Sequence, residues 1–477
     1  MKTYKKNYLY VVMYNVLSII TPLVTAPYIS RVLGVEGIGT YSYYYAIAYY
    51  FTLIAKMGLT NYGTRRIAEV KDDEEKLSKE FSSIYFMQIF FGIITSIVYF
   101  IAVFVLYQNN KVIGLIFGIW VVGNVFNTDW VLFGIEKFRQ TSTINMIIKI
   151  IEVISIFIFI KNVNDLWKYC LICAIGYFGC YLYFLKVVFK SIKITKVARK
   201  NILTHFWPCL LLMIPVIALN VYRSMDKVML GYMSDMVQTG YYENAEKIIY
   251  TLTMFISSLG TVMMPRASSM LSKGKQEEIV ASLNKSLNFI YFITSAMCFG
   301  VLAVSKSLVP WFFGEEFYGS IILLDILAIT LILIGIGNVL RTQYIIPSKK
   351  DNIYIKSISL GAIINLVVNI ILIPRYQAIG ACIATVIAEL VVPVYQYIMV
   401  KDEIKVENPF KNVIFYVVCG LMMFAALKCI ENVMGTGFKT LIVQVISGGI
   451  IYMSLTYYKT KNMVRINIFS KGKRIDI

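Results

Sequence analysis

The sequence predicts an all-α protein that crosses a membrane many times, and three observations lead to this fold class. Of the 477 residues, 58% are hydrophobic and 15% are charged, whereas soluble domains average about 25% charged residues. Apolar segments near the roughly 20 residues that a membrane-spanning helix needs recur along the chain. Lysine and arginine gather in alternate connections between these segments, which is the charge pattern of a polytopic membrane protein.

About fourteen apolar segments qualify as transmembrane helices. They are residues 8–30, 40–63, 82–107, 113–133, 143–160, 167–189, 205–231, 240–264, 286–308, 319–345, 355–374, 378–400, 410–430 and 438–458. The basic connections lie on the same side as the N-terminus and the C-terminal tail, so the positive-inside rule places both termini in the cytoplasm. The same rule accounts for the formal charge of +19, and we therefore expect no nucleic-acid partner.

The two halves of the chain repeat one pattern of helices. Segments 8–30 and 205–231 each carry two prolines, and Gly39-Thr40-Tyr41 aligns with Gly240-Tyr241-Tyr242 at an offset of 201 residues. Six spans separate the copies, so both begin on the same side and predict a parallel repeat about an axis along the membrane normal. We expect one six-helix lobe at 1–200, a second at 201–402, and two additional helices with a basic tail at 403–477.

Charged residues inside the apolar segments mark a candidate cavity. Residues 222–247 hold two groups with helical i, i+3, i+4 spacing: Arg223, Asp226 and Lys227, then Glu243, Glu246 and Lys247. Charges in hydrocarbon are costly, so these side chains should face each other or a wet cavity. Either they form a closed network that joins two helices, or some of the cations are available to an anionic substrate.

Lys56 and Glu389 are two further ionisable residues within predicted spans. The span of Lys56 contains no acid, so its ammonium must find a partner on another helix, extend toward the membrane surface, or wait for a substrate. Glu389 lies deep in the second half of the chain. It is a candidate for ion coupling, with a protonated, hydrogen-bonded acid as the alternative.

Seven segments, taken in order, resemble the Wzx-type polysaccharide flippases of the multidrug/oligosaccharidyl-lipid/polysaccharide exporter superfamily. They are PYISRVLGVEGIGTYSY, LTNYGTRRIA, SMDKVMLGY, GYYENAEKI, VMMPRAS, QYIIPSKKD and INLVVNIILIPRYQAIGACIATVIAE, between about Tyr8 and Val400. The resemblance implies two six-helix lobes around a V-shaped central cavity, plus two extra helices. It also implies that undecaprenyl-diphosphate-linked oligosaccharide repeat units are moved from the inner to the outer leaflet of the bacterial plasma membrane, for capsule, exopolysaccharide or O-antigen synthesis.

The resemblance also implies roles for the charged residues. Related lipid II flippases hold the diphosphate of their lipid with cationic side chains in the cavity, and lysine would serve as a point charge there. We expect the substrate to meet Lys56 first, then Arg223, Lys227 and Lys247, with Arg31 at the outer turn. The candidates for ion coupling or gating are Glu389, Asp226, Glu243 and Glu246. Expected partners are the lipid-linked oligosaccharide, membrane lipids, and polysaccharide polymerase and chain-length machinery.

Two alternatives belong to other functional classes. An ion-coupled multidrug or other lipid transporter of the same superfamily would use Glu389, Glu152 or Asp226 to bind a proton or sodium ion. A membrane polymerase or glycosyltransferase would need a sizeable outer loop, and the predicted outer loops are short. The sequence shows no His/Ser, Cys/His or metal-ligand constellation, so we expect no catalytic residues, no metal and no cofactor.

Overall fold

A computed structural model describes the backbone of residues 2–106, 110–404 and 409–464, and the side chains of residues 9–105, 110–213, 216–217, 220, 224–404 and 413–459. Within these residues the chain folds into helices and contains no β-strand. The predicted all-α fold is thereby confirmed. The chain divides into two compact units, residues 1–243 with 366–381 and residues 244–365 with 382–477. The predicted lobe boundaries at 200 and 402 stay a prediction.

Unit 1 contains α1 (Lys2–Lys56), α2 (Leu59–Val70), α3 (Glu74–Leu106), α4 (Lys111–Gly123), η1 (Asn124–Phe126), α5 (Asp129–Gly134), α6 (Phe138–Phe159), η2 (Val163–Asp165), α7 (Leu166–Phe189), α8 (Arg199–Thr204) and α9 (Phe206–Met233). Unit 2 contains α11 (Gln276–Phe313), η3 (Glu315–Gly319), α12 (Ser320–Ala328), α13 (Thr330–Leu340), η4 (Arg341–Ile345), α15 (Pro409–Met434) and α16 (Phe438–Val464). Two helices contribute to both units, α10 (Met236–Ser272) and α14 (Asp351–Ile404).

The described helices account for all of the predicted membrane spans. Ten helical segments are long and apolar enough to cross a membrane. Two of these segments hold two predicted spans each, because non-helical backbone at Gly34 in α1 and at Gln377 in α14 divides them. The predicted spans 113–133 and 205–231 correspond to the shorter apolar helix Lys111–Phe126 and to α9. The ten segments therefore hold twelve of the predicted spans, and these two helices hold the other two.

Two predicted spans are not continuous, which corrects the expectation for 40–63 and 113–133. The first stops at Lys56, because Met57 and Gly58 have φ values of 45° and 70°, outside the helical region. The second stops at Gly123, and the chain passes through η1 before α5 begins. The Asn127 side chain accepts a hydrogen bond from the backbone N–H of Asp129 at 3.0 Å, a local contact that competes with helix formation.

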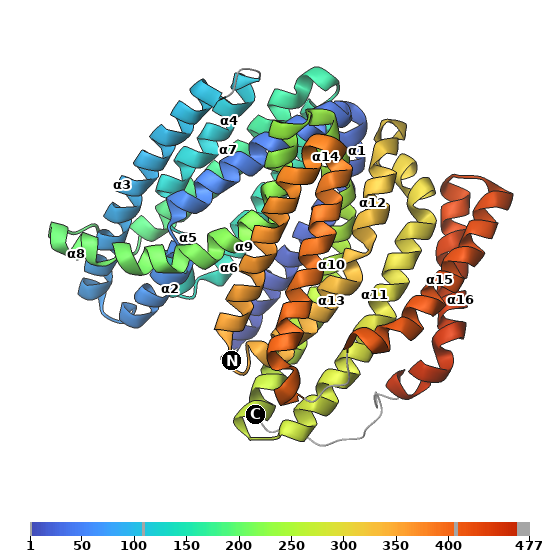
Figure 1. Cartoon of the computed structure of the whole chain (residues 1–477). Helices are drawn as coiled ribbons and strands as arrows, with labels where there is room; N and C mark the ends of the chain where they lie inside the picture. The colour runs from blue at the N-terminus through green and yellow to red at the C-terminus, as the bar shows by residue number, and fades with distance from the viewer. Residues whose placement is uncertain (1, 107–109, 405–408, 465–477) are drawn as a thin grey trace. The chain divides into compact units, whose positions relative to one another are not determined.

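The core of unit 1 supports the second half of α1. In Figure 1, α3, α4 and α7 run side by side in this unit. Aromatic rings join these helices to α1, since the Trp120 ring stacks on Tyr177 at 4.3 Å and on Tyr45 at 5.0 Å. Such ring pairs contribute roughly 0.5–1.5 kcal/mol beyond area burial. This stack fixes which face of residues 35–56 points into the unit.

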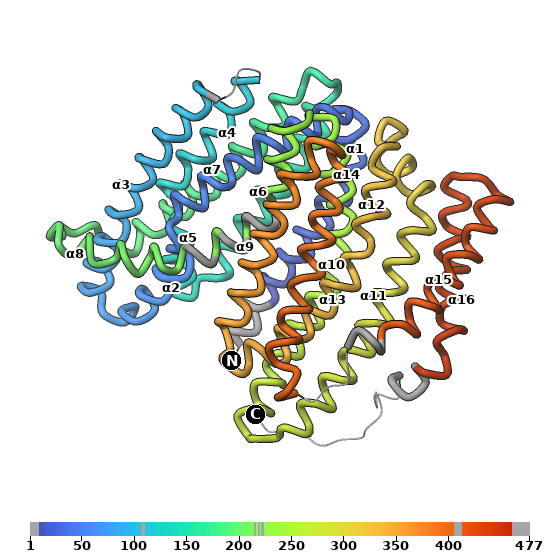
Figure 2. The backbone as a smooth tube through the Cα atoms, viewed as in Figure 1, coloured from blue at the N-terminus to red at the C-terminus, as the bar shows by residue number. Residues whose placement is uncertain are grey.

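In unit 2 the last two helices pack on α11 (Figure 2). Their contact has an apolar core of Phe299, Met423 and Leu427 among other residues. Gln444 of α16, fully buried, donates to the backbone carbonyls of Ala303 and Leu427 at 3.3 and 3.2 Å. The buried Nε2 of Gln444 thus joins α16 to both α11 and α15.

Residues of the two predicted repeats contact each other in unit 1. A Cβ atom added to Gly39 would lie 1.7 Å from the carbonyl oxygen of Met236, and one added to Gly240 would lie 2.2 Å from that of Val35. Val35 and Gly39 are the repeat partners of Met236 and Gly240 at the offset of 201 residues. Reciprocal contact of equivalent residues is what a two-fold axis produces, so the contact agrees with the predicted repeat.

We expect Gly240→Ala to destabilise the protein strongly, because the added methyl group meets backbone atoms that cannot rotate away. Overpacking of this kind typically costs about 1–3 kcal/mol or more. Gly300→Ala is the matched control, because nothing lies within 4 Å of a Cβ atom at Gly300 in α11. Thermal unfolding in detergent should show a lower midpoint for Gly240→Ala alone, and equal midpoints for the two variants would contradict the close crossing.

Candidate functional site

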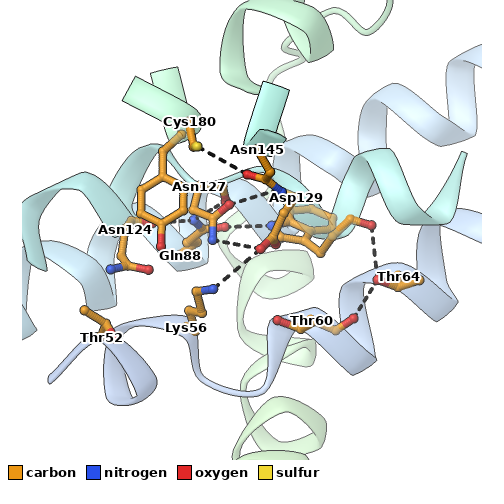
Figure 3. Close-up of polar contacts among 12 residues, drawn as sticks. Thr52, Lys56, Thr60, Thr64, Gln88, Asn124, Asn127, Asp129, Asn145 and Cys180 are labelled. Carbon is orange, nitrogen blue, oxygen red and sulfur yellow. Dashed lines mark hydrogen bonds and ion pairs between the residues drawn. The ribbon is translucent and has the colours of Figure 1, made fainter. Parts of the chain in front are cut away.

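Lys56 forms an ion pair with Asp129 at the end of α1. Its Nζ lies 3.5 Å from Asp129 Oδ2, and the two side chains are 28% and 16% exposed. Figure 3 shows the ammonium directed toward the carboxylate, which sits at the first residue of α5. The Tyr181 ring lies 5.8 Å from the same ammonium, within cation–π range. Of the possibilities left open by the sequence, Lys56 has found a partner on another helix.

Polar side chains hold Asp129 in place. Asn127 Nδ2 donates to Asp129 Oδ2 at 3.1 Å. Gln88 in α3 in turn donates to the carbonyl oxygens of Asn124 and Asn127 at 2.8 and 2.7 Å, and its Oε1 accepts from Trp130 Nε1 at 2.9 Å. Gln88 thus binds two backbone carbonyls at the break between α4 and α5. The interruption of the span therefore builds the site.

The ion pair between Lys56 and Asp129 is a loose one. Charge-assisted N–H···O bonds are usually about 2.7–2.9 Å long, so a contact at 3.5 Å is loose. An ammonium has three donors, and one of them faces Asp129. The Lys56 side chain is 28% exposed.

A second network joins α9, α10 and α1 within unit 1. Lys227 Nζ lies 2.6 Å from Glu243 Oε2, and Ser42 of α1 donates to the same oxygen at 2.7 Å. Next to Lys227, the buried Asp226 accepts from Tyr242 at 2.6 Å and from Asn369 of α14 at 2.5 Å. Three of the predicted charges are therefore engaged with one another or with neighbouring helices, as in the closed-network account.

The two networks lie at different heights of one helix. Ser42 and Lys56 are fourteen residues apart in α1, which corresponds to about 21 Å along a helix axis. The structure therefore does not bring Lys56 together with Lys227 at one point. One network ties helices to each other, and the other presents a loosely held cation.

The remaining predicted site residues lie elsewhere. Lys247 of α10 donates to Asn244 at 3.3 Å in unit 2. Glu246 and Glu389 are both partly exposed in unit 2, and Arg31 is exposed in unit 1. The side chain of Arg223 lies outside the described residues, although its backbone belongs to α9.

Sequence reasoning missed Asp129, Gln88, Ser42 and Asn369 as members of these networks. Asp129 had a usable signal, because Asn124, Asn127 and Asp129 crowd three polar residues into one otherwise apolar segment. Ser42 and Asn369 gave little signal in the sequence, since single small polar residues are common in membrane helices.

An all-helical fold with ion pairs inside its spans is typical of a membrane transporter, because such charges usually mark substrate or ion pathways. Residues 4–271 match the protein family described as "Polysaccharide biosynthesis protein". More than half of the chain matches, and the chain belongs to this family.

Individual relatives agree with the family. A "Putative O-antigen transporter" of Escherichia coli K12 is 22% identical over 407 residues, covering 83% of this chain and 97% of the relative. A "Capsular polysaccharide biosynthesis protein CapF" of Staphylococcus aureus is 23% identical and covers 83% of this chain and 99% of the relative. The "Lipid II flippase MurJ" of Bacillus subtilis is 24% identical over 217 residues, 42% of this chain and 40% of the relative.

Solved structures show the same fold. "Lipid II flippase MurJ, inward closed conformation" superposes with a TM-score of 0.71 at 17% identity, covering 96% of this chain and 99% of the other. An inward-facing multidrug resistance MATE family transporter of the MOP superfamily gives 0.59 at 14% identity, covering 86% and 94%. The chain therefore has the fold shared by these transporters.

Proposed function

We propose that the protein is a flippase that moves lipid-linked oligosaccharides across the membrane for polysaccharide synthesis. Its family has the description "Polysaccharide biosynthesis protein". Its relatives include proteins named for O-antigen transport, capsule synthesis and lipid II flipping. A sugar head group cannot cross hydrocarbon unaided, because its hydroxyl groups would lose their hydrogen bonds. A multi-helix protein with polar groups inside its spans can supply hydrogen bonds in place of those lost to water.

The assignment of the site rests on one observation, which is the loose ion pair of Lys56 at the end of α1. The substrate is an undecaprenyl-diphosphate-linked repeat unit, and its diphosphate contacts the Lys56 ammonium while Asp129 keeps that ammonium oriented. Arg31, Arg223, Lys227 and Lys247 are further cations of the proposed path. Proposed partners are membrane lipids, a polysaccharide polymerase and its chain-length regulator, in a bacterial plasma membrane with both termini in the cytoplasm.

Deletion of the protein tests this function. We expect lipid-linked repeat units to accumulate on the inner leaflet and surface polysaccharide to disappear, while assembly of the repeat unit on its lipid continues. Extraction of the lipid fraction and staining of the cell surface measure the two outcomes. If assembly on the lipid stopped instead, an enzymatic role would replace the flippase proposal.

We propose that ion coupling involves Glu389, with Asp226, Glu243 and Glu246 as the other acidic candidates. Asp226 is buried and receives two hydrogen bonds at 2.6 Å or less. Glu389 is partly exposed on the second half of α14. These positions give Asp226 a fixed environment, so Glu389 is the better candidate for a group that gains and loses a proton.

Glu389→Gln should uncouple transport from the proton or sodium gradient, because the amide keeps the shape of the acid and cannot ionise. The measurement is surface polysaccharide with and without an ionophore that collapses the gradient. Asp402→Asn, an exposed acid on the same helix, serves as the control. Unchanged gradient dependence in Glu389→Gln would remove this residue from the mechanism.

A further inference from the structure

Residues 190–200 of unit 1, which we call the basic strap, run from the end of α7 to the start of α8 and carry five exposed cations. These are Lys190, Lys193, Lys196, Arg199 and Lys200. Residues 166–225 of the sequence contain no aspartate or glutamate. Within the part of the chain that the structure describes, none of the five cations forms an ion pair. The positive charge of the strap is therefore not neutralised by neighbouring acids.

A second basic segment in the same region of unit 1 is neutralised. In Figure 1, α8 lies at the edge of this unit beyond α2 and α3, and α3 packs against α8. The connection from α2 to α3 and its flanks also hold five cations, and each has a carboxylate partner. The pairs are Arg65–Glu69, Arg66–Glu80, Lys71–Glu136, Lys76–Asp73 and Lys79–Glu75. The positive-inside rule counts lysine and arginine and is little affected by acids, so it does not explain this difference.

The basic strap is fixed on α3, although its residues 192–198 form neither helix nor strand. The backbone N–H of Thr195 donates to Ser82 Oγ at 2.9 Å, and Ile192 is buried. Lys193 and Lys196, on either side of this contact, point to the surface. A segment that is already held in place loses less conformational freedom when it binds a partner. The strap thus presents its cations from an ordered backbone.

Large apolar side chains are exposed beside these cations. Ile194, Leu203 and Trp207 are 50%, 62% and 62% exposed. The strap follows directly on α7, which belongs to a segment long and apolar enough to cross a membrane. Basic residues next to exposed aliphatic and tryptophan side chains are typical of segments at a membrane interface, where tryptophan lies at the level of the headgroups.

We propose that the basic strap binds the headgroups of anionic phospholipids. Four to eight basic residues at the end of a span are a recognised pattern for such lipids. The lipid phosphates contact the five cations, and Ile194, Leu203 and Trp207 contact the acyl chains. An acidic protein would match the charge alone, whereas a bilayer beside the end of α7 supplies both kinds of contact. This site is separate from Lys56 and does not depend on which substrate is transported.

Quenching of tryptophan fluorescence by brominated lipids tests this contact. The full chain is placed in phosphatidylcholine nanodiscs that contain a minor fraction of brominated phosphatidylglycerol or of brominated phosphatidylcholine. Because the chain contains five tryptophans, the signal of Trp207 is the difference between the unsubstituted protein and Trp207→Phe. We expect the brominated phosphatidylglycerol to quench Trp207 at least twice as strongly. Equal quenching would overturn the proposal and favour an acidic protein as the occupant of the strap.

Two matched double variants connect the lipid preference to the strap. Lys193→Gln with Lys196→Gln removes two cations that form no ion pair among the described residues. The control, Lys76→Gln with Lys79→Gln, removes two exposed lysines of the same spacing that each have a carboxylate partner. The strap variant should lose more than half of the excess quenching by phosphatidylglycerol, and the control should retain it. An equal excess in both variants would show that the preference arises elsewhere and would overturn the proposal.

A salt series on the unsubstituted protein gives an answer even if the strap variant unfolds more easily. Salt at about 1 M shortens the Debye length to about 3 Å, so the excess quenching by phosphatidylglycerol should disappear. An excess that persisted at this salt concentration would exclude the cations as its cause. Absence of Trp207 quenching by either lipid would place the strap away from the bilayer and would likewise overturn the proposal.

Discussion

Lys56→Ala should abolish transport while leaving the abundance of the protein unchanged. The substitution removes the loosely held ammonium, and a hydrogen bond to a charged group contributes about 1.5–3 kcal/mol, which corresponds to roughly a 10- to 150-fold loss of affinity. Asp129 keeps its hydrogen bond from Asn127 and is partly exposed, so its carboxylate tolerates the loss of the partner. Surface polysaccharide and membrane abundance are measured in the same cells.

Two further variants separate binding of an anion from structural support. Lys56→Arg should retain part of the activity, because the positive charge survives although its geometry changes. Asp129→Asn should keep the fold and reduce transport less than Lys56→Ala, since the amide still orients the ammonium through its oxygen. Normal surface polysaccharide in Lys56→Ala would exclude the binding role.

Lys227→Ala should lower the stability and abundance of the protein. Lys227 and Glu243 are only 18% and 13% exposed at a separation of 2.6 Å, and the cost of removing one partner rises toward about 3–5 kcal/mol as such a pair becomes fully buried. Lys275→Ala is the matched control, because Lys275 and Glu278 have the same 2.6 Å separation with side chains 48% and 56% exposed. Exposed pairs contribute about 0–1 kcal/mol. Thermal unfolding in detergent compares the two variants.

The outcome for Lys227 also decides between the two accounts of the charged hairpin. Reduced abundance with proportionally reduced transport would assign Lys227 to the support of α9 and α10. Normal abundance with lost transport would instead place Lys227 among the residues that contact the diphosphate, and the closed-network account would be wrong.

The sequence predicts the fold well because the membrane imposes strict rules on helix length and charge. The apolar segments and the repeat at 39–41 and 240–242 are visible in composition and spacing, and the structure contains helices at every predicted span. The breaks at Gly58 and Asn124 were not predicted, because averaged hydropathy does not register a few residues of unusual backbone.

The site was harder to predict than the fold. Lys56 stands out in the sequence, but its partner Asp129 lies seventy-three residues away, and only the packing of α1 against α4 and η1 decides that the two meet. The cations of the basic strap are visible in the sequence. Its attachment to α3 through Thr195 and Ser82 is not, because it depends on a contact between residues far apart in the chain.

The bond between Ser42 and Glu243 has a consequence for how the chain arose. These residues are separated by 201 positions, the offset that relates the two halves, so each occupies the same place in its own half. Immediately after a gene duplication the two positions held the same amino acid, and an acid would have faced an identical acid. Like charges in contact repel strongly in a region of low dielectric constant. The carboxylate that now binds Lys227 could therefore have been accommodated there only after the two copies had begun to diverge.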